Sequence, residues 1–365
     1  MPTRIYLDAN ATEPLRPEAR EAALAALDLT GNPASVHGFG RAARAKLEAA
    51  RETIAARFGG QPADLVFTSG GTEANALAIA GLAAGRRRII SAIEHDAVRN
   101  AAPEAALIPV DRQGVADLEA LAGLLAKGPA AFVALMLANN ETGVIQPIAG
   151  AASLCRRFGA HLHVDAVQGA GRIACDLAAL GADSLALSGH KLGAPAGAGA
   201  LLLTAEAAAR LTPMITGGGQ ERGRRGGTPP LAAIAGFAAA AATARPSPTL
   251  AALRDAAEAA ALAAGAHICG AGVARLPNTT CLALPGVKAE TQVIALDLAG
   301  IAVSAGAACS AGKIAQSHVL AAMGLGALAG QAIRVSLPWH ASAADIDAFA
   351  AAYRTMAARL SRRAA

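Results

Sequence analysis

The chain has 365 residues, of which 54% are hydrophobic and 16% are charged, a balance that supplies ample apolar surface for folding and excludes an intrinsically disordered protein. This length exceeds the usual size of a single hydrophobic core, so we expect a large domain and a smaller one. The net charge is +5, but the basic residues are scattered without an aromatic-interleaved patch, which argues against nucleic acid as a partner.

The N-terminus and the cysteines bear on where the protein works. The first residues, MPTRIYLDAN, contain no apolar signal core, and no uncharged apolar run reaches the ~18 residues that a membrane span needs. The cysteines form no C-x-x-C pair, and their odd number, 5, fits neither a disulfide framework nor a zinc ribbon. We therefore expect a soluble, cytoplasmic protein with no membrane partner.

From about residue 42 to residue 337, apolar strand-like runs alternate with alanine-rich helical stretches. The expected strands are Leu65–Thr68, Arg88–Ser91, Phe132–Leu137, His161–Asp165, Ser184–Leu187 and Ala200–Leu203. This alternation predicts an α/β fold with a mostly parallel sheet covered by helices. Pro246 and Pro248 interrupt the helical pattern, and a new helix begins near Leu250, so the boundary between the two domains is expected there.

The segment LVFTSGGTEANALAIAG reads as a strand, a turn and a helix. Such a turn presents the backbone N–H groups around Gly71 and the hydroxyl of Thr72 at a helix N-terminus, where a phosphate group is favoured. A plain helix cap by Thr72 would explain the same residues. The turn is therefore a candidate phosphate site, with structural capping as the alternative.

In the segment HLHVDAVQG, His161, His163 and Asp165 alternate along one expected strand and share one of its faces. A metal site would need a third or fourth ligand at matched geometry. Asp165 also stands where the strand ends, which is the usual place for catalytic groups in open α/β sheets. We favour a catalytic role for Asp165 and expect no metal.

The segment SLALSGHKLGAPAGAGALLL carries Ser188, His190 and Lys191 on the turn after an apolar strand. Most lysines are solvated surface residues, and that is one interpretation of Lys191. The other is a lysine that forms a Schiff base in a partly desolvated pocket beside a phosphate-bearing cofactor.

Two glycine-rich segments follow. TGGGQERGRRGGTPP is either a mobile loop or a loop that reaches an anionic site. VSAGAACSAGK places Cys309 among small residues, whereas a structural cysteine more plausibly lies in an apolar run, as Cys281 does in TTCLAL. Because a thiolate is the nucleophilic form of cysteine, Cys309 is a candidate nucleophile. The other four cysteines are expected to be structural.

Taken in order, these segments resemble the cysteine desulfurase family, within the class-V, fold-type I enzymes that use pyridoxal 5′-phosphate. The resemblance covers nearly the whole chain and is carried by YLDANAT, GNPASVHGFGR, FTSGGTEAN, EHDAV, LANNETGVIQP, HVDAVQ, SGHK, GGGQERGRRGGT, SAGAACSAG, SHVLAAMG and IRVSL. It implies a large cofactor-binding domain, residues 16–247, with a seven-stranded sheet. It also implies a smaller α+β domain, residues 1–15 and 248–365, which carries the cysteine loop and an arginine for the substrate carboxylate.

The resemblance implies a role for particular residues of this chain. Lys191 would bond to the cofactor aldehyde. The other cofactor contacts would come from Gly71, Thr72, Ser188 and His190 at the phosphate, Asp165 at the pyridine nitrogen, Gln168 and Asn140 near the ring hydroxyl, and His95 stacked on the ring. Thr228 would reach the phosphate in the neighbouring subunit of a homodimer. Arg334, with Asn140, would bind the substrate carboxylate.

The implied reaction removes sulfur from L-cysteine. Lys191 would take the Cα proton, His95 would help to move protons, and Cys309 would take the sulfur as a persulfide while L-alanine leaves. A protein acceptor would then receive the sulfur, either an iron–sulfur scaffold or a sulfur-transfer protein. The chain ends at RLSRRAA, without the tail that housekeeping members of the family use to hold a scaffold, so the acceptor is left open.

The sequence also departs from the family's pattern. Ala9 replaces a common asparagine, Glu13 replaces a common threonine, and GAAC replaces GSAC around Cys309. Alternative activities are selenocysteine lyase, cysteine or cystine lyase, aminotransferase, and a non-catalytic scaffold for sulfur transfer. Transamination has no need of Cys309, and a scaffold has no need of the complete set of catalytic residues.

Overall fold

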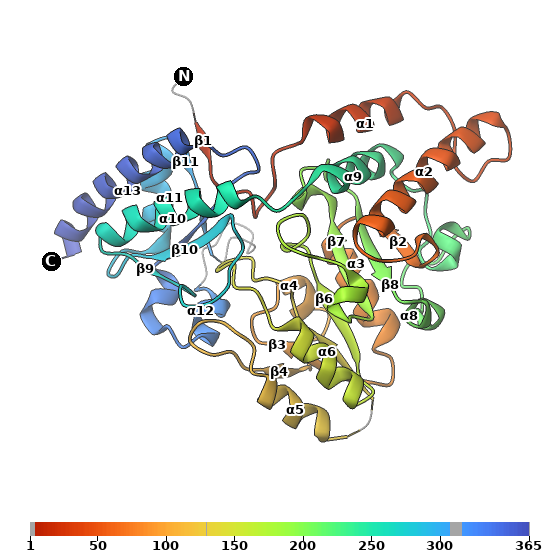
Figure 1. Ribbon diagram of the computed structural model, residues 1–365, viewed down its shortest axis with the longest axis horizontal. Coiled ribbons are helices and arrows are strands. Elements are labelled where there is room, and N and C mark those ends of the chain that lie inside the picture. Colours follow the sequence, from red (N-terminus) through yellow and green to blue (C-terminus); the bar gives the residue numbers. More distant parts are fainter. Residues whose placement is uncertain (1–3, 129, 307–315, 365) are drawn as a thin grey trace.

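The structure is a computed structural model that describes residues 4–128, 130–306 and 316–364. Within these residues, a seven-stranded sheet forms the centre of the larger part of the molecule (Figure 1). Its strands, in spatial order, are β2 (Leu65–Thr68), β8 (Gly199–Leu203), β7 (Ser184–Ser188), β6 (His161–Asp165), β5 (Ala131–Ala134), β3 (Arg87–Ser91) and β4 (Ala106–Ile108). In this sheet β8 is antiparallel to its neighbours β2 and β7, and the other adjacent pairs are parallel. The α/β fold with a mostly parallel sheet is confirmed.

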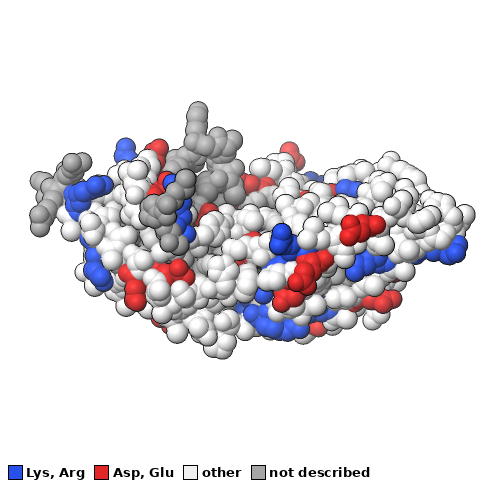
Figure 2. All heavy atoms as spheres, turned by 90° about the horizontal axis from the view of Figure 1, so that it is seen from above, with Lys and Arg blue, Asp and Glu red and all other residues white. Residues whose placement is uncertain are grey.

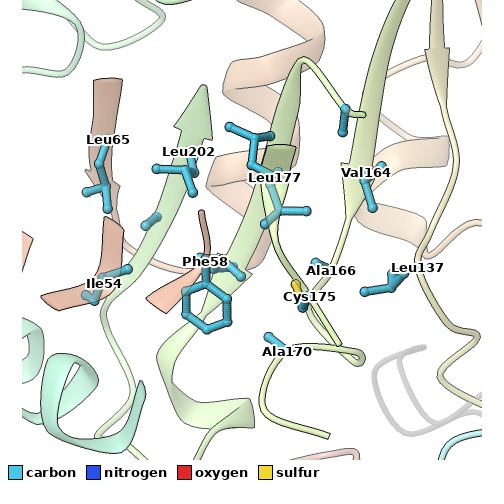
Figure 3. Close-up of a cluster of buried hydrophobic side chains, with 14 of the residues drawn as sticks. Ile54, Phe58, Leu65, Leu137, Val164, Ala166, Ala170, Cys175, Leu177 and Leu202 are labelled. Carbon is cyan, nitrogen blue, oxygen red and sulfur yellow. The ribbon is translucent and has the colours of Figure 1, made fainter. Parts of the chain in front are cut away.

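Helices cover both faces of this sheet because successive residues of a strand point to opposite sides. Leu65 and Phe67 belong to the core on one face, which α1 (Pro17–Leu27), α2 (Gly38–Arg57), α5 (Leu118–Ala126), α6 (Ile148–Arg157), α7 (Leu177–Leu180) and α9 (Leu231–Thr243) cover. Figure 3 shows part of this core, including Phe58 between Ile54 and Cys175. Val66 belongs to the core on the opposite face, which α3 (Gly71–Leu82), α4 (Asp96–Arg99) and α8 (Ala205–Arg210) cover.

A second, smaller sheet contains four strands, counted over the described residues, in the order β12 (Ser304–Ala305), β13 (Ala332–Ser336), β10 (Thr279–Ala283) and β9 (His267–Ile268). Its pairs are antiparallel. Beside it lie α10 (Pro248–Ala263), α11 (Ala289–Leu298), α12 (His318–Ala322) and α13 (Ala343–Ala364). Pro248 occupies the first turn of α10, where a proline is tolerated because that N–H has no partner within the helix.

The N-terminal strand β1 (Ile5–Tyr6) pairs with β11 (Ile301–Ala302). Leu7 accordingly packs in the core of the smaller sheet. This pairing fits the division into residues 16–247 and residues 1–15 with 248–365, which stays a prediction. Short 3₁₀ helices complete the described structure: η1 (Pro62–Asp64), η2 (Gly189–Lys191), η3 (Gln220–Gly223) and η4 (Gly326–Gly330).

Basic and acidic side chains lie intermixed on the face of the molecule seen in Figure 2. Among the helices of the described ranges, none combines the length and the apolar character needed to cross a membrane.

Candidate active site

A cavity opens where the parallel strands of the large sheet end. Its volume is about 570 Å³, including the open space at its mouth. The segments that follow β2, β3, β5, β6 and β7 all contribute to its wall, as expected for the carboxyl edge of an open α/β sheet. The residues predicted from the sequence that line it are Gly71, Thr72, His95, Asn140, Asp165, Gln168, Ser188, His190 and Lys191.

The turn between β2 and α3 packs too tightly for side chains at two glycines. A β-carbon on Gly71 would lie 2.6 Å from Val167 Cγ2, and one on Gly199 would lie 2.6 Å from the backbone of Gly70. This close packing leaves the first N–H groups of α3 and the exposed Thr72 at the cavity. Because helix N-termini favour negative charge, this end of the cavity suits a phosphate group.

Asp165 ends β6 and lies 6% exposed at the wall of the cavity. Its Oδ1 accepts the N–H of Val167 at 2.9 Å, and its Oδ2 accepts from Asn75 Nδ2 at 2.8 Å. Burial raises the pKa of this carboxyl group, while the N–H of Val167 and the charges of His95 and Lys191 act in the opposite direction. A buried carboxylate held in this way is suited to pair with a protonated ring nitrogen.

Asn75 connects Asp165 to a chain of buried polar groups. Because its amide nitrogen faces Asp165, its Oδ1 accepts from His163 Nε2 at 2.9 Å, which assigns the proton of that ring to Nε2. Ser184 Oγ then donates to His163 Nδ1 at 2.9 Å. Burial, and then the neighbouring His161, lower the pKa of His163 to about 3. Within the described residues, no three side chains of His, Cys, Asp or Glu gather as metal ligands.

Lys191 ends η2, directly after β7, and lies at the cavity rather than on the open surface. Its Nζ donates to the carbonyl oxygens of Asn10 at 2.5 Å and Ala11 at 2.8 Å. Burial, and then the charge of Lys191, lower the pKa of His190 to about 4. The N-terminal segment is therefore part of the site, which the motifs alone did not reveal.

His95 and Glu94 follow β3. His95 Nδ1 accepts the N–H of Ala97 at 3.0 Å and so caps α4. Glu94 is fully buried, and its Oε1 accepts the N–H of Met136 at 2.7 Å. Burial, and then Asp165, raise the pKa of Glu94 well above its ordinary value. Asp165 lines the cavity, whereas Glu94 does not.

Arg334 lies on β13 and reaches the site through Asn140. Its Nη1 donates to the carbonyl oxygen of Asn140 at 3.1 Å, and its Nη2 donates to Asp8 Oδ1 at 2.6 Å. Its buried Nε has no partner in the part of the chain that the structure describes. An additional N–H is thus available for a carboxylate.

Cys309 lies outside the described residues, but the chain on either side of residues 307–315 meets Glu141. Ser317 Oγ donates to Glu141 Oε2 at 2.5 Å. A β-carbon on Gly306 would collide with the same carboxylate, so any larger residue there would require Glu141 to move. Glu141 directly follows Asn140, which lines the cavity.

The structure does not bring Thr228 into the cavity that contains Lys191. Thr228 instead lines a separate hollow together with Thr68, Glu221 and Arg225.

Sequence reasoning missed several residues that shape the site. Asn75 was detectable as the one amide in the apolar run of α3, four residues after Gly71 and so on the same face of the helix. Asn10 and Arg172 carried no comparable signal, because their contacts join segments more than 150 residues apart.

Comparisons with known proteins give a consistent result. The family model described as "Aminotransferase class-V" matches residues 5–349. A cysteine desulfurase of Cereibacter sphaeroides is 42% identical over 94% of this chain and 93% of its own length, and an IscS-like cysteine desulfurase of Mycobacterium tuberculosis is 37% identical over 94% and 93%. The crystal structure of a NifS-like protein from Rickettsia africae superposes with a TM-score of 0.90 at 37% identity, over 97% of this chain and 99% of that one.

Proposed function

Because this chain belongs to the class-V aminotransferase family and is a cysteine desulfurase, we propose that its cavity binds pyridoxal 5′-phosphate on Lys191 and that sulfur from L-cysteine passes to Cys309. Members of this family use pyridoxal phosphate. The main observation in support is that Lys191, Asp165 and the N-terminus of α3 all line one cavity.

The chemistry of the cavity wall matches the groups of this cofactor. The N–H groups at the start of α3, with Thr72 and Ser188, suit its phosphate. Asp165, held by Asn75 and Val167, suits a protonated pyridine nitrogen. Lys191 supplies the amine for its aldehyde, and Gly71 keeps space that a β-carbon could take only by displacing Val167. These observations support a fit between site and cofactor.

When bound, pyridoxal phosphate supplies a ring that accepts electrons and so stabilises negative charge on the Cα of an attached amino acid. Asp165 would hold the ring nitrogen in its protonated form, because the negative charge of a buried carboxylate stabilises a positive charge beside it. Lys191 removes the Cα proton once its Nζ has left the carbonyl oxygens of Asn10 and Ala11. His95, at the start of α4, lines the same cavity, where it would lie against the ring and move protons near it.

Arg334 orients the substrate by binding its carboxylate. A guanidinium is planar and always charged, and it matches a carboxylate with two parallel N–H groups. Its contact with Asn140 and its available Nε support this role. An amino acid bound in this way presents its side chain for the sulfur step.

In the sulfur step, the thiolate of Cys309 attacks the sulfur of substrate cysteine. The new S–S bond forms as the Cβ–S bond breaks and leaves its electron pair on carbon. Cβ then takes a proton, and Lys191 returns a proton to Cα, which completes L-alanine. One cysteine and one enzyme thiol thus give one alanine and one enzyme persulfide, without an external oxidant. The persulfide sulfur then passes to an acceptor protein, either an iron–sulfur scaffold or a sulfur-transfer protein.

We also propose that the enzyme is a homodimer in the cytoplasm. Thr228 lines a hollow separate from the cavity of its own chain, which supports a role at the neighbouring subunit's cofactor. The absence of paired cysteine spacing in the sequence supports a reducing compartment.

The proposal is tested by loading the protein with pyridoxal phosphate and adding L-cysteine. We expect a visible absorbance band, equimolar alanine and persulfide in a single turnover, and a 32-dalton adduct, the mass of about one sulfur atom, on Cys309 by mass spectrometry.

Lys191→Ala should abolish the band, whereas the control Lys288→Ala should retain it. Cys309→Ala should keep the band and lose persulfide formation, whereas Cys155→Ala should retain both. Sulfide release that survives Cys309→Ala would contradict a persulfide enzyme and favour a lyase.

A further inference from the structure

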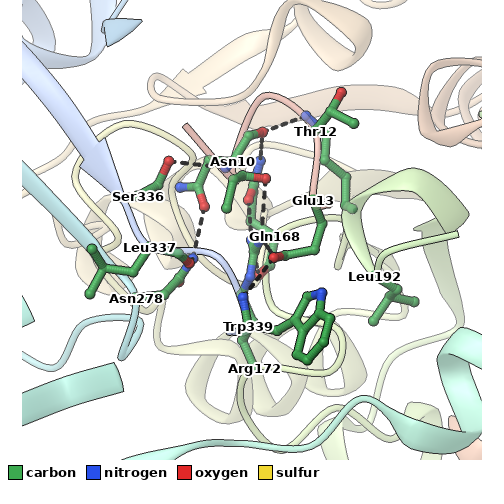
Figure 4. Close-up of polar contacts among 12 residues, drawn as sticks. Asn10, Thr12, Glu13, Gln168, Arg172, Leu192, Asn278, Ser336, Leu337 and Trp339 are labelled. Carbon is green, nitrogen blue, oxygen red and sulfur yellow. Dashed lines mark hydrogen bonds and ion pairs between the residues drawn. The ribbon is translucent and has the colours of Figure 1, made fainter. Parts of the chain in front are cut away.

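Gln168 lies between two groups that fix the direction of its side-chain amide (Figure 4). On one side its Nε2 donates to the carbonyl oxygen of Asn10 at 3.1 Å. On the other side its Oε1 accepts from Arg172 Nη1 at 2.6 Å. The amide is thus held from both ends.

Both neighbours dictate the same orientation. An arginine can only donate hydrogen bonds, so the atom facing Arg172 must be the carbonyl oxygen of the amide. A backbone carbonyl can only accept, so the atom facing Asn10 must be the nitrogen. The amide nitrogen carries two N–H groups, of which the bond to Asn10 uses one. Because Gln168 lines the cavity, the second N–H is the group that it can offer to a ligand there.

Arg172 is itself held firmly. Its Nη2 lies 3.0 Å from Glu13 Oε2, and the two side chains are 8% and 5% exposed. Glu13 uses its other oxygen to accept the N–H of Trp339 at 2.8 Å. Since an unpaired charge in such a buried place is costly, neither partner leaves the pair readily. Glu13 replaces the family's usual threonine. Through its two oxygens it connects the N-terminal segment to both Arg172 and Trp339.

We infer that Arg172, held by Glu13, is a positioning residue that makes Gln168 a hydrogen-bond donor toward the cofactor ring. The inference rests on the proposed function, because it takes the ligand to be pyridoxal phosphate with its ionised ring oxygen near Gln168. A donor stabilises that anionic oxygen. Without Arg172 only the 3.1 Å bond to the carbonyl oxygen of Asn10 still holds the amide, so the amide turns more readily to present its own oxygen, which repels the anion and weakens binding.

The experiment measures the affinity of the protein for pyridoxal phosphate and the pH at which the bound chromophore changes colour. In Arg172→Met we expect the dissociation constant to rise about tenfold, as for loss of one hydrogen bond to a charged group. The colour changes when the imine between Lys191 and the cofactor aldehyde loses its proton. We expect the pH midpoint of this change to rise in Arg172→Met, because a ring oxygen that has lost its hydrogen-bond donor holds the imine proton more tightly. Arg172→Lys, which keeps a charged donor, should restore both values toward wild type.

Arg172→Met leaves Glu13 buried and unpaired, so the double variant Glu13→Gln with Arg172→Met provides the same test without that charge and keeps an acceptor for Trp339. Arg245→Met is the matched control. Arg245 lines the same neighbouring cavity as Arg172, but its bonds go to the carbonyl oxygens of Ala241 and Ala244. It should leave affinity and midpoint unchanged.

The outcomes separate this inference from the proposed function. If the wild-type protein takes up no pyridoxal phosphate, the proposed function fails and the inference fails with it. If the wild type binds the cofactor and the folded double variant keeps the same affinity and midpoint, only the role of Arg172 is overturned. An equal effect of Arg245→Met would also overturn it, because general charge and not the orientation of Gln168 would then be responsible.

Discussion

Arg51 and Glu221 form a buried pair joined by two hydrogen bonds of 2.8 Å, although 170 residues separate them. Each side chain is 5% exposed. Arg51 Nη1 also donates to the carbonyl oxygen of Leu65, and Glu221 Oε2 accepts the N–H of Phe67, so the pair completes the hydrogen bonding at the outer edge of β2. Glu221 holds a left-handed backbone, with φ 49°. The arginine-rich loop that leads to Thr228 is therefore anchored to the strand that precedes the turn at Gly71.

Glu221→Ala should lower the free energy of unfolding by about 3 kcal/mol, because it leaves the buried Arg51 with only the more exposed Glu48 as a charged partner and removes the acceptor of the N–H of Phe67. The matched control is Glu206→Ala, which breaks the exposed pair with Arg210 and should cost at most about 0.5 kcal/mol. Urea unfolding followed by circular dichroism measures both. Equal losses in the two variants would show that the buried pair contributes no more than a surface pair.

Gly71→Ala should weaken the binding of pyridoxal phosphate about tenfold, since the added methyl group meets Val167 beneath the cavity and displaces it. The double variant with Val167→Ala removes that collision and should recover most of the affinity. Gly123→Ala is the control, because a β-carbon there meets nothing within 4 Å. It should stabilise α5 by roughly 0.5–1 kcal/mol and leave binding unchanged. Failure of the double variant to recover affinity would contradict the steric explanation.

Much of the large sheet could be predicted from the sequence because its strands are short apolar runs between helical stretches. The expected strands Leu65–Thr68 and His161–Asp165 agree with the structure residue for residue. β5 ends at Ala134, not at Leu137, although Leu135 and Leu137 still donate backbone hydrogen bonds to β6. β4 was missed because it is only three residues long and two of them are exposed at the sheet edge.

The contacts of the candidate site were less accessible to sequence reasoning. Motifs could identify Asp165 and Lys191, since Asp165 is the last residue of an expected strand and Lys191 lies on the turn after another. They could not show that Asn10 accepts hydrogen bonds from both Gln168 and Lys191, because this depends on how the N-terminal segment docks. Likewise, the sequence showed only that Glu13 replaces a common threonine of the family, and its buried partner Arg172 is evident only in three dimensions.

Arg334→Lys should raise the KM for L-cysteine about tenfold or more, because a lysine cannot grip a carboxylate with two parallel N–H groups. The visible band of the cofactor should stay unchanged, since Arg334 reaches the site through Asn140 and does not line the cavity. Steady-state kinetics and absorbance spectra test both expectations. Arg254→Lys, at a partly buried arginine of α10 that bonds to Leu276, is the control. A loss of the band with unchanged KM would instead assign Arg334 to the cofactor.

In Cys309→Ala protein, two of the four remaining thiols, those of Cys155 and Cys175, should react with iodoacetamide at least about a hundredfold more slowly than a free cysteine at pH 7.5, because burial keeps them from forming the thiolate. All four are buried, and burial raises the pKa of Cys155 and of Cys175 to about 12. Mass spectrometry of the intact protein counts the labels, and urea should expose every thiol as a positive control. Rapid labelling of Cys155 or Cys175 in the folded protein would contradict their structural role.

His163 should make the free energy of unfolding depend on pH below neutrality. Its pKa is about 3 in the folded protein and about 6.5 in the unfolded chain. Between these values the unfolded state binds the extra proton, so the stabilisation is complete above pH ~6.5 and falls by about 1.4 kcal/mol per pH unit as the pH drops toward 4. His163→Gln, which keeps a donor for Asn75, should therefore show a shallower slope than wild type in urea titrations from pH 7 to 4.

Carboxylates contribute to both proteins alike, so the difference between the two slopes isolates the histidine. His267→Gln, at an exposed histidine, should keep the wild-type slope. Parallel curves for wild type and His163→Gln would mean that the ring is not held neutral between Asn75 and Ser184.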